Sequence, residues 1–143
     1  MKLSTRGRYG VRLMVDLALH YGEGTHLLKD IAKRQEISEK YLWQLIKPLK
    51  SAKLINSARG AHGGYKIARH PSEITLREIV EVLEGPICIV ECADDPDICD
   101  RAQTCATRDI WSEVSNMISR LLESVNLENM VERKKGKCIY FGI

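Results

Sequence analysis

The feature that most restricts the fold is a pair of short amphipathic segments joined by a tight turn. Residues 27–34 place their apolar side chains on one helical face, and a turn at Glu36-Ile37 leads to Ser38, a residue type that favours helix N-termini. Two short helices in this arrangement predict a helix-turn-helix, in which Pro48 should bend or shorten the end of the second helix. The inner stripe of that second helix consists of Leu42, Leu45, Ile46 and Leu49.

A glycine-rich hairpin follows directly after the second helix. Residues 54–58 and 65–68 have the composition of two strands, and the connecting turn is Arg59-Gly60-Ala61-His62-Gly63-Gly64. An earlier helix over residues 6–21 precedes the pair, with Tyr21 on its buried face and Gly22 after its end. The predicted fold is therefore mainly α with a small β-hairpin wing, that is, a winged helix-turn-helix.

The second half of the chain predicts two further helices and a cysteine-rich loop. Thr75 and Glu78 form a capping box for a helix over residues 76–83, which Gly85-Pro86 stops. A helix over residues 107–125 carries an apolar stripe of roughly five turns, more than a small domain needs, which predicts a dimer helix; packing within one chain is the alternative. Its stripe consists of Ile110, Trp111, Val114, Met117, Ile118, Leu121, Leu122 and Val125.

Beyond this helix come a basic tail at residues 133–137 and an apolar end at residues 138–143, which could add a strand or dock on a partner. The expected organisation is a winged helix-turn-helix at residues 1–85, a Cys-rich loop at 86–106, and a dimerisation helix with a C-terminal tail at 107–143.

Charge is distributed unevenly along the chain. Residues 1–75 hold 14 Lys and Arg against 6 Asp and Glu, a net +8, whereas residues 76–130 hold 4 against 12, a net −8. A cationic first half suits a polyanion such as double-stranded DNA, although a chance division of surface charge is the simpler alternative. The chain has no apolar run of the ~20 residues that a membrane span requires and no secretory signal, so we expect a cytoplasmic protein without a membrane partner.

The predicted second helix and the wing supply the candidate DNA contacts. Gln44 can pair with adenine, and Lys40 or Lys47 can reach guanine or phosphate in the major groove. Trp43 is unusual on such a face and either contacts a sugar or thymine methyl or covers the edge of the core. Arg59 suits a narrow minor groove, which an ordinary hairpin turn would not explain. The full candidate set is Ser38, Lys40, Tyr41, Trp43, Gln44, Lys47, Arg59, Gly60, His62, Gly63 and Gly64.

Five cysteines without a secretory signal indicate thiol or metal chemistry rather than a disulfide framework. Cys92, Cys99 and Cys105 lie in one polar loop, with Cys88 four residues upstream. Their spacings differ from the CxxC pairs of zinc ribbons, and three soft thiolates suit an iron–sulfur cluster. Zinc and metal-free thiols remain alternatives. An enzyme is disfavoured, because no His or Asp is paired with a Cys in a nucleophile arrangement.

Four segments together resemble the Rrf-type family of bacterial winged-helix regulators: MKLSTRGRYGVRLMVDLA, ISEKYLWQLIKPLKSAKLI, RGAHGGYKI and CADDPDICDRAQTCATRDIW. The resemblance implies a homodimer with a crossed dimer helix that binds a palindromic operator. In the subgroup that regulates iron–sulfur cluster assembly genes, it implies a [2Fe–2S] cluster held by Cys92, Cys99 and Cys105, and we expect this chain to be a repressor of such genes. A second subgroup represses cysteine metabolism, lacks the Cys loop and responds to a protein partner.

The chain departs from the cluster-binding subgroup at two positions. That subgroup has a His as fourth ligand three residues after the last Cys, where this chain has Arg108, which cannot ligate iron. It also has a Glu in the recognition helix where this chain has Trp43, so operator discrimination should differ. The fourth ligand could come from the partner subunit or from Cys88, Glu91, Asp94, Asp95, Asp97 or Asp109.

Overall fold

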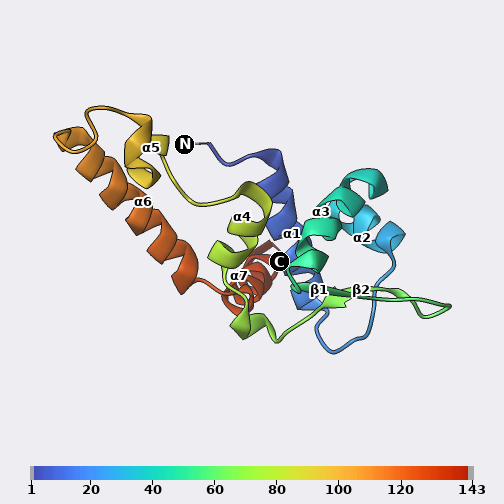
Figure 1. Cartoon of the computed structure of the whole chain (residues 1–143). Helices are drawn as coiled ribbons and strands as arrows, with labels where there is room; N and C mark the ends of the chain where they lie inside the picture. Colours follow the sequence, from blue (N-terminus) through green and yellow to red (C-terminus); the bar gives the residue numbers. More distant parts are fainter. Residues whose placement is uncertain (1, 142–143) are drawn as a thin grey trace.

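The structure is a computed structural model that describes residues 2–141, with side chains through residue 137. It is mainly helical and contains one antiparallel hairpin, which confirms the predicted fold class (Figure 1). In chain order the elements are α1 (Thr5–Leu19), α2 (Leu28–Gln35), α3 (Glu39–Ser51), β1 (Ile55–Ala58), β2 (Gly64–Ile67), the 3-10 turn η1 (Pro71–Glu73), α4 (Leu76–Glu84), α5 (Glu91–Asp94), the 3-10 turn η2 (Pro96–Ile98), α6 (Ala106–Ser124) and α7 (Leu127–Phe141).

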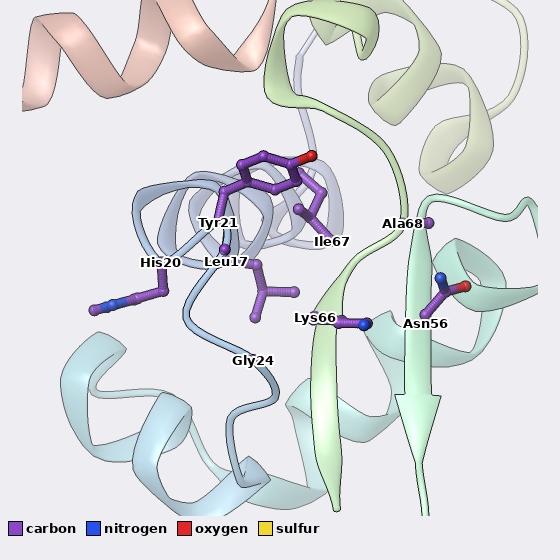
Figure 2. Close-up of a pocket in the computed structure, with 9 residues that line it drawn as sticks. Leu17, His20, Tyr21, Gly24, Asn56, Lys66, Ile67 and Ala68 are labelled. Atoms are coloured by element: carbon purple, nitrogen blue, oxygen red, sulfur yellow. The ribbon is translucent and has the colours of Figure 1, made fainter.

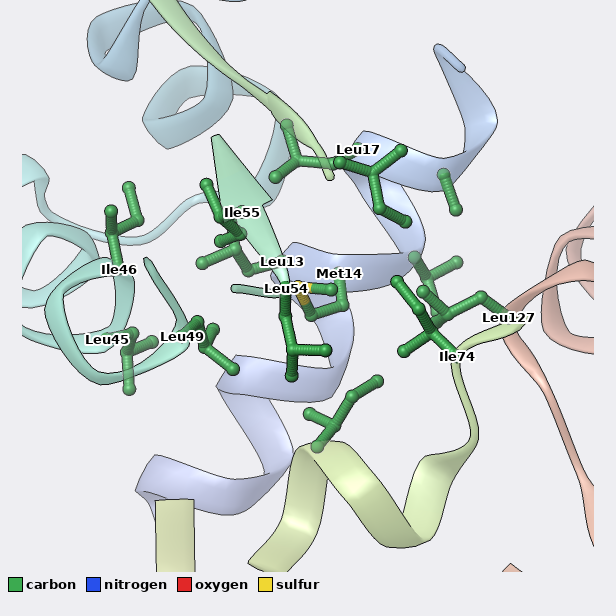
Figure 3. Close-up of a cluster of buried hydrophobic side chains, with 14 of the residues drawn as sticks. Leu13, Met14, Leu17, Leu45, Ile46, Leu49, Leu54, Ile55, Ile74 and Leu127 are labelled. Carbon is green, nitrogen blue, oxygen red and sulfur yellow. The ribbon is translucent and has the colours of Figure 1, made fainter. Parts of the chain in front are cut away.

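The first helix, α1, is the centre of the hydrophobic core. It packs against α2, α3, α4, α7 and β2, and its residues Leu13, Met14 and Leu17 are almost completely buried (Figure 3). The predicted inner stripe of α3 is buried as expected and faces the same core. Burying each such side chain contributes about 1.5–3 kcal/mol, so this core holds the helix-turn-helix and the hairpin in a fixed relation.

Polar caps define where the helices begin. The Ser38 hydroxyl accepts a hydrogen bond from the Tyr41 amide at 3.2 Å, and the Thr75 hydroxyl accepts one from the Glu78 amide at 3.2 Å. Only half of the predicted capping box forms, because the Glu78 carboxylate pairs instead with Arg69. The helix α3 continues to Ser51 despite Pro48, so the proline does not shorten it.

Three expectations about local structure were wrong. The first helix ends at Leu19, and Tyr21, predicted to be buried, is 49% exposed. The Cys-rich loop is not wholly irregular, since it contains α5 and η2. The predicted C-terminal tail is helical in α7, so the strand predicted as one alternative for residues 138–143 is absent from residues 138–141. Docking of this end on a partner stays a prediction, and residues 142–143 lie outside the described part of the chain.

The chain enters α7 through a short pairing with the segment before α4. The Leu76 amide donates to the Val125 carbonyl at 2.9 Å, and the Leu127 amide donates to the Ile74 carbonyl at 2.9 Å. Leu127 and Val131 then join the hydrophobic core beside α1. These contacts explain why a segment that looks like a basic tail in the sequence folds as a helix.

The helix α6 lies at the opposite end of the molecule from α2, α3 and the hairpin (Figure 1). It packs on α4 and α5. Among the described residues, no helix is both long and apolar enough to cross a membrane. The structure thus places the candidate DNA-contacting elements at one end and the cysteines at the other.

Candidate nucleic-acid interface and cysteine loop

The outer face of α3 carries the three polar residues that the sequence analysis selected for base contacts. Lys40, Gln44 and Lys47 are exposed, whereas the apolar stripe on the other side of the same helix is buried. Because the stripe fixes the rotation of α3, these three side chains are presented to solvent together. This is the arrangement that a major-groove recognition helix requires.

Two aromatic residues of α3 have different environments. Trp43 is 46% exposed, lies outside the core and has the Lys47 ammonium 3.6 Å from its ring centroid. Tyr41 is half-buried and packs edge-on against Tyr9 with ring centroids 5.9 Å apart. Nearly half of the Trp43 surface is therefore open to solvent.

The wing presents an unpaired cation at its turn. Arg59 is exposed, and no side-chain hydrogen bond or ion pair involves it within the described part of the chain. A Cβ at Gly63 would lie 2.6 Å from the Ala58 carbonyl oxygen, and one at Gly64 would lie 2.3 Å from that of His26. These two glycines are thus required by close contacts within the protein itself.

The base of the wing is attached to the loop between α1 and α2. The His26 amide donates to the Tyr65 carbonyl and the Tyr65 amide donates to the His26 carbonyl, both at 2.8 Å, and the Thr25 hydroxyl donates to the His62 carbonyl at 2.6 Å. A hollow beside this junction separates the end of α1 from the hairpin, with Lys66 and Asn56 on its strand side (Figure 2). This junction leaves no signal in the sequence, because it depends on contacts between segments about 40 residues apart.

A buried polar cluster fixes α2 against α1. Asp16 is 2% exposed and accepts hydrogen bonds from the Arg34 guanidinium at 2.7 and 3.1 Å and from the Gln35 amide at 3.0 Å. Burial alone would raise the pKa of Asp16, but the hydrogen bonds from Arg34 and Gln35 and the charge of Arg34 outweigh it, so the pKa is lowered. The carboxylate therefore stays ionised and holds the first helix of the helix-turn-helix in place.

The candidate metal-binding cysteines surround the start of α6. Cys92 lies in α5, Cys99 directly follows η2, and Cys105 caps α6. All three are free thiols at least partly exposed to solvent, and the upstream Cys88 donates through its sulfur to the Val90 carbonyl at 2.7 Å.

The environment of Cys105 favours its thiolate form. A hydrogen bond with the Thr107 hydroxyl, at 3.1 Å from the sulfur, and the backbone amides of Arg108 and Thr107 lower the pKa of this thiol. Thiolates are the form in which cysteine binds metal. The donor set therefore fits a group that is held by soft anionic sulfur.

The three sulfur atoms do not converge on a single ion in this conformation. Among the residues that the structure describes, three metal-ligating atoms lie within 4.8 Å of one another only at His20, Glu23 and His26. Arg108 has a structural role, since its Nε donates to the Cys92 carbonyl at 2.7 Å and so joins α6 to α5.

The apolar stripe of α6 is largely uncovered. Met117 is 66% exposed and Leu121 is 65% exposed, and Ile110 and Trp111 are also exposed. The polar Ser115 on the adjacent face is buried and accepts from the Ile89 amide at 3.1 Å. The helix therefore uses one face within its own chain and leaves a second, apolar face to solvent.

Comparison with known proteins identifies the family. The family model Rrf2, described as an iron-dependent transcriptional regulator, matches residues 3–133. The chain belongs to the Rrf2 family. The resemblance noted from the sequence is thereby confirmed, and Rrf2 proteins are DNA-binding transcription regulators rather than enzymes.

Relatives named CymR and relatives named IscR both match this chain at similar identity. The HTH-type transcriptional regulator CymR of Bacillus subtilis is 41% identical over 137 residues, covering 96% of this chain and 94% of CymR, and its solved structure superposes with a TM-score of 0.79 over 93% of this chain and 98% of that one. T. potens IscR superposes with a TM-score of 0.77 at 41% identity, covering 94% and 88% of the two chains. IscR of Photorhabdus laumondii is 36% identical over 135 residues, covering 94% of this chain and 82% of IscR.

Proposed function

We propose that this Rrf2 protein is a homodimeric repressor that binds a palindromic operator through α3 and the wing and senses an iron–sulfur cluster at Cys92, Cys99 and Cys105. The observation that carries the proposal is the joint exposure of Lys40, Gln44 and Lys47 on a helix whose opposite face is locked in the core. The winged-helix unit over residues 1–85 reads DNA, and the division into residues 86–106 and 107–143 follows the cysteines and α6.

Each DNA-contacting residue has a role that matches its chemistry. Gln44 reads adenine, and the two lysines of α3 reach guanine or phosphate. Trp43 contacts a sugar or a thymine methyl, with Lys47 beside its ring. Arg59 enters the minor groove. The Ser38 hydroxyl, which accepts from the Tyr41 amide, keeps its own proton for a phosphate oxygen, and the remaining phosphate-side candidates are Tyr41, Gly60, His62, Gly63 and Gly64.

The uncovered stripe of α6 supports the homodimer. A partner helix that covered Met117 and Leu121 would remove their side chains from water. The two recognition helices of such a dimer must lie about 34–36 Å apart, or a multiple of that spacing, to enter successive major grooves. Any change at α6 would therefore change DNA affinity.

The cysteine loop is suited to act on that spacing. Cys105 caps α6, and Arg108 of the same helix holds the Cys92 carbonyl, so the loop and the dimer helix are directly connected. When bound, a [2Fe–2S] cluster would supply a group that responds to iron supply and oxidants. Since Arg108 cannot ligate iron, the fourth ligand comes from another residue of the loop, such as Cys88, or from the partner.

A second candidate function is supported by the CymR relatives. The solved B. subtilis protein is described as a global cysteine regulator, and it matches this chain as well as the IscR structure does. Under this alternative the same DNA-binding unit reports a thiol state, zinc or a protein partner of cysteine metabolism. The separation of the three sulfurs favours free thiols over a preformed zinc site.

The deciding experiment is isolation without air, with iron and acid-labile sulfide measured beside DNA binding. The DNA probe is a duplex selected by the protein from a random library. We expect about two iron and two sulfide per chain, lost in Cys92→Ala, Cys99→Ala and Cys105→Ala and retained in the control Cys138→Ala.

Two outcomes contradict parts of the proposal. Full occupancy in one of the three variants removes that cysteine as a ligand. A colourless wild-type protein that still binds its operator, with steep loss of affinity as salt rises, keeps the DNA-binding role and selects the second candidate.

A further inference from the structure

A group of three metal-ligating side chains lies at the end of α1, far from the cysteine loop. His20 caps α1, and Glu23 and His26 follow in the loop that leads to α2. One ligand atom from each of the three lies within 4.8 Å of the other two, and His20 Nδ1 is 2.6 Å from the Glu23 carboxylate. The two imidazole rings are 4.6 Å apart between centroids.

A second observation at the same place points to a ligand. His26 Nε2 is buried and, among the described residues, is the one buried side-chain nitrogen or oxygen atom without a hydrogen-bond partner. Such orphaned polar atoms are rare and costly, and a bound ion would satisfy this nitrogen.

We propose that His20, Glu23 and His26 bind a divalent transition-metal cation of the zinc class, with water in the remaining position. Two imidazoles and one carboxylate are a common zinc donor set, and an open fourth position is usual when the protein supplies three ligands. Bonds of about 2.0–2.2 Å would bring the donor atoms to roughly 3.3 Å from one another, so side-chain rotations suffice. The exposed Glu23 carboxylate gives access from solvent.

The position of this site gives it a consequence for the wing. The backbone of His26 makes both hydrogen bonds to Tyr65 of β2, and a Cβ at Gly64 would collide with the His26 carbonyl. An ion that bridges His20 and His26 would therefore fasten the end of α1 to the base of the hairpin. The site lies in the DNA-binding unit and does not depend on the cysteine loop.

The test uses the full chain with Cys88, Cys92, Cys99 and Cys105 replaced by Ala, so that the loop contributes no thiolate. Zn²⁺ is titrated by calorimetry, and Co²⁺ is used as a spectroscopic probe. We expect one ion per chain and a Co²⁺ spectrum without thiolate charge-transfer absorption. Because Glu23 is exposed, the Glu23→Gln variant should fold normally. Glu23→Gln and His26→Gln should each weaken Zn²⁺ binding more than tenfold.

The matched control is His70→Gln, which removes a histidine that hydrogen-bonds with Ser72 outside the site and should leave Zn²⁺ affinity unchanged. Circular dichroism confirms folding of each variant. The proposal is overturned if less than half an ion binds per chain, if Glu23→Gln and His26→Gln retain full affinity, or if His70→Gln loses as much affinity as they do.

Discussion

The two ends of the molecule differ in how completely they bury their apolar side chains. The winged-helix unit of residues 1–85, together with α7, surrounds one continuous core to which α1, α3 and both strands contribute. The cysteine arm, here α5, η2 and α6, is held by α4, the Ile89–Ser115 hydrogen bond and the Arg108–Cys92 hydrogen bond. The first unit is complete in one chain, whereas the second leaves large apolar side chains in water.

Under the proposed function, this difference separates a rigid DNA-binding unit from an adaptable sensing arm. A close-packed core prevents α3 from shifting, so the recognition residues keep a fixed position relative to the wing. The cysteine arm has few buried contacts, and segments of that kind are the ones that open locally or change shape when something binds. In the proposed dimer, contact between two copies of α6 would link the cysteine arm of one chain to the DNA-binding units of both chains.

The largest expected effect comes from charging the uncovered stripe of α6. Replacing Met117 and Leu121 with Glu should abolish the dimer, because each buried side chain of this kind contributes about 1.5–3 kcal/mol. We expect the dimer dissociation constant to rise by at least ~100-fold, measured by analytical ultracentrifugation. The unfolding transition of the winged-helix core should remain.

The control for this change is Asn116→Lys, which adds charge to the polar flank of the same helix. It should leave the dimer intact. If the double Glu variant stayed fully dimeric at low concentration, the stripe of α6 would not be the interface, and the comparison between a complete and an incomplete unit would fail.

The next largest effect tests the rigid unit. Asp16→Asn should lower the free energy of unfolding by ~2 kcal/mol, because it leaves the Arg34 guanidinium without its carboxylate; Arg34 is one-third exposed, so the loss falls below that of a fully buried pair. Thermal or urea unfolding measures it. Asp100→Asn, an exposed carboxylate in the cysteine arm, should change stability very little.

The contribution of Asp16 should also depend on pH. Its pKa is lowered in the folded state, so its stabilising effect is present above the ordinary carboxyl pKa of about 3.9 and is lost as the pH falls through the folded value. The difference in unfolding free energy between wild type and Asp16→Asn should therefore be constant near neutrality and shrink below about pH 4. An unchanged difference at pH 3 would show that Asp16 is not held ionised by Arg34 and Gln35.

The sequence predicted most of the rigid unit and little of the connections between units. Helical spacing located the inner stripe of α3, and Ser38 and Thr75 marked helix starts, because these signals depend on residues within one or two turns. The helix α7 was missed because its few core residues, Leu127 and Val131 among them, are buried against distant segments, chiefly α1, which lies more than 100 positions earlier in the chain.

The candidate sites show the same limit. The pattern of the cysteines was visible in the sequence, but the bond from Arg108 to the Cys92 carbonyl depends on how α5 folds back on α6. The group of His20, Glu23 and His26 was also missed, although its spacing is short, because isolated histidines in a loop carry no signal until their rings are placed together.

A smaller effect concerns the DNA-reading surface alone. Arg59→Ala should weaken specific operator binding by ~1–3 kcal/mol, because an Arg in a narrow minor groove contributes through charge and shape. Competition binding at several salt concentrations measures this loss. The control Arg120→Ala removes the same exposed side chain type from α6 and should leave operator affinity unchanged. Equal losses in both variants would indicate a general effect of charge rather than a contact made by the wing.

The smallest expected effect concerns a hydrogen bond inside the cysteine arm. Arg108→Ala removes the hydrogen bond to the Cys92 carbonyl, which should cost about 1 kcal/mol locally, since a net hydrogen bond is worth about that much. Limited proteolysis between residues 90 and 105 should become several-fold faster, while Arg101→Ala, an exposed arginine in the same loop, should leave the rate unchanged. Amide exchange in α3 should stay as slow as in the wild type, because the core around α1 does not depend on this bond. Faster exchange in α3 would mean that the arm and the DNA-binding unit unfold together, and the two regions would then form one cooperative unit.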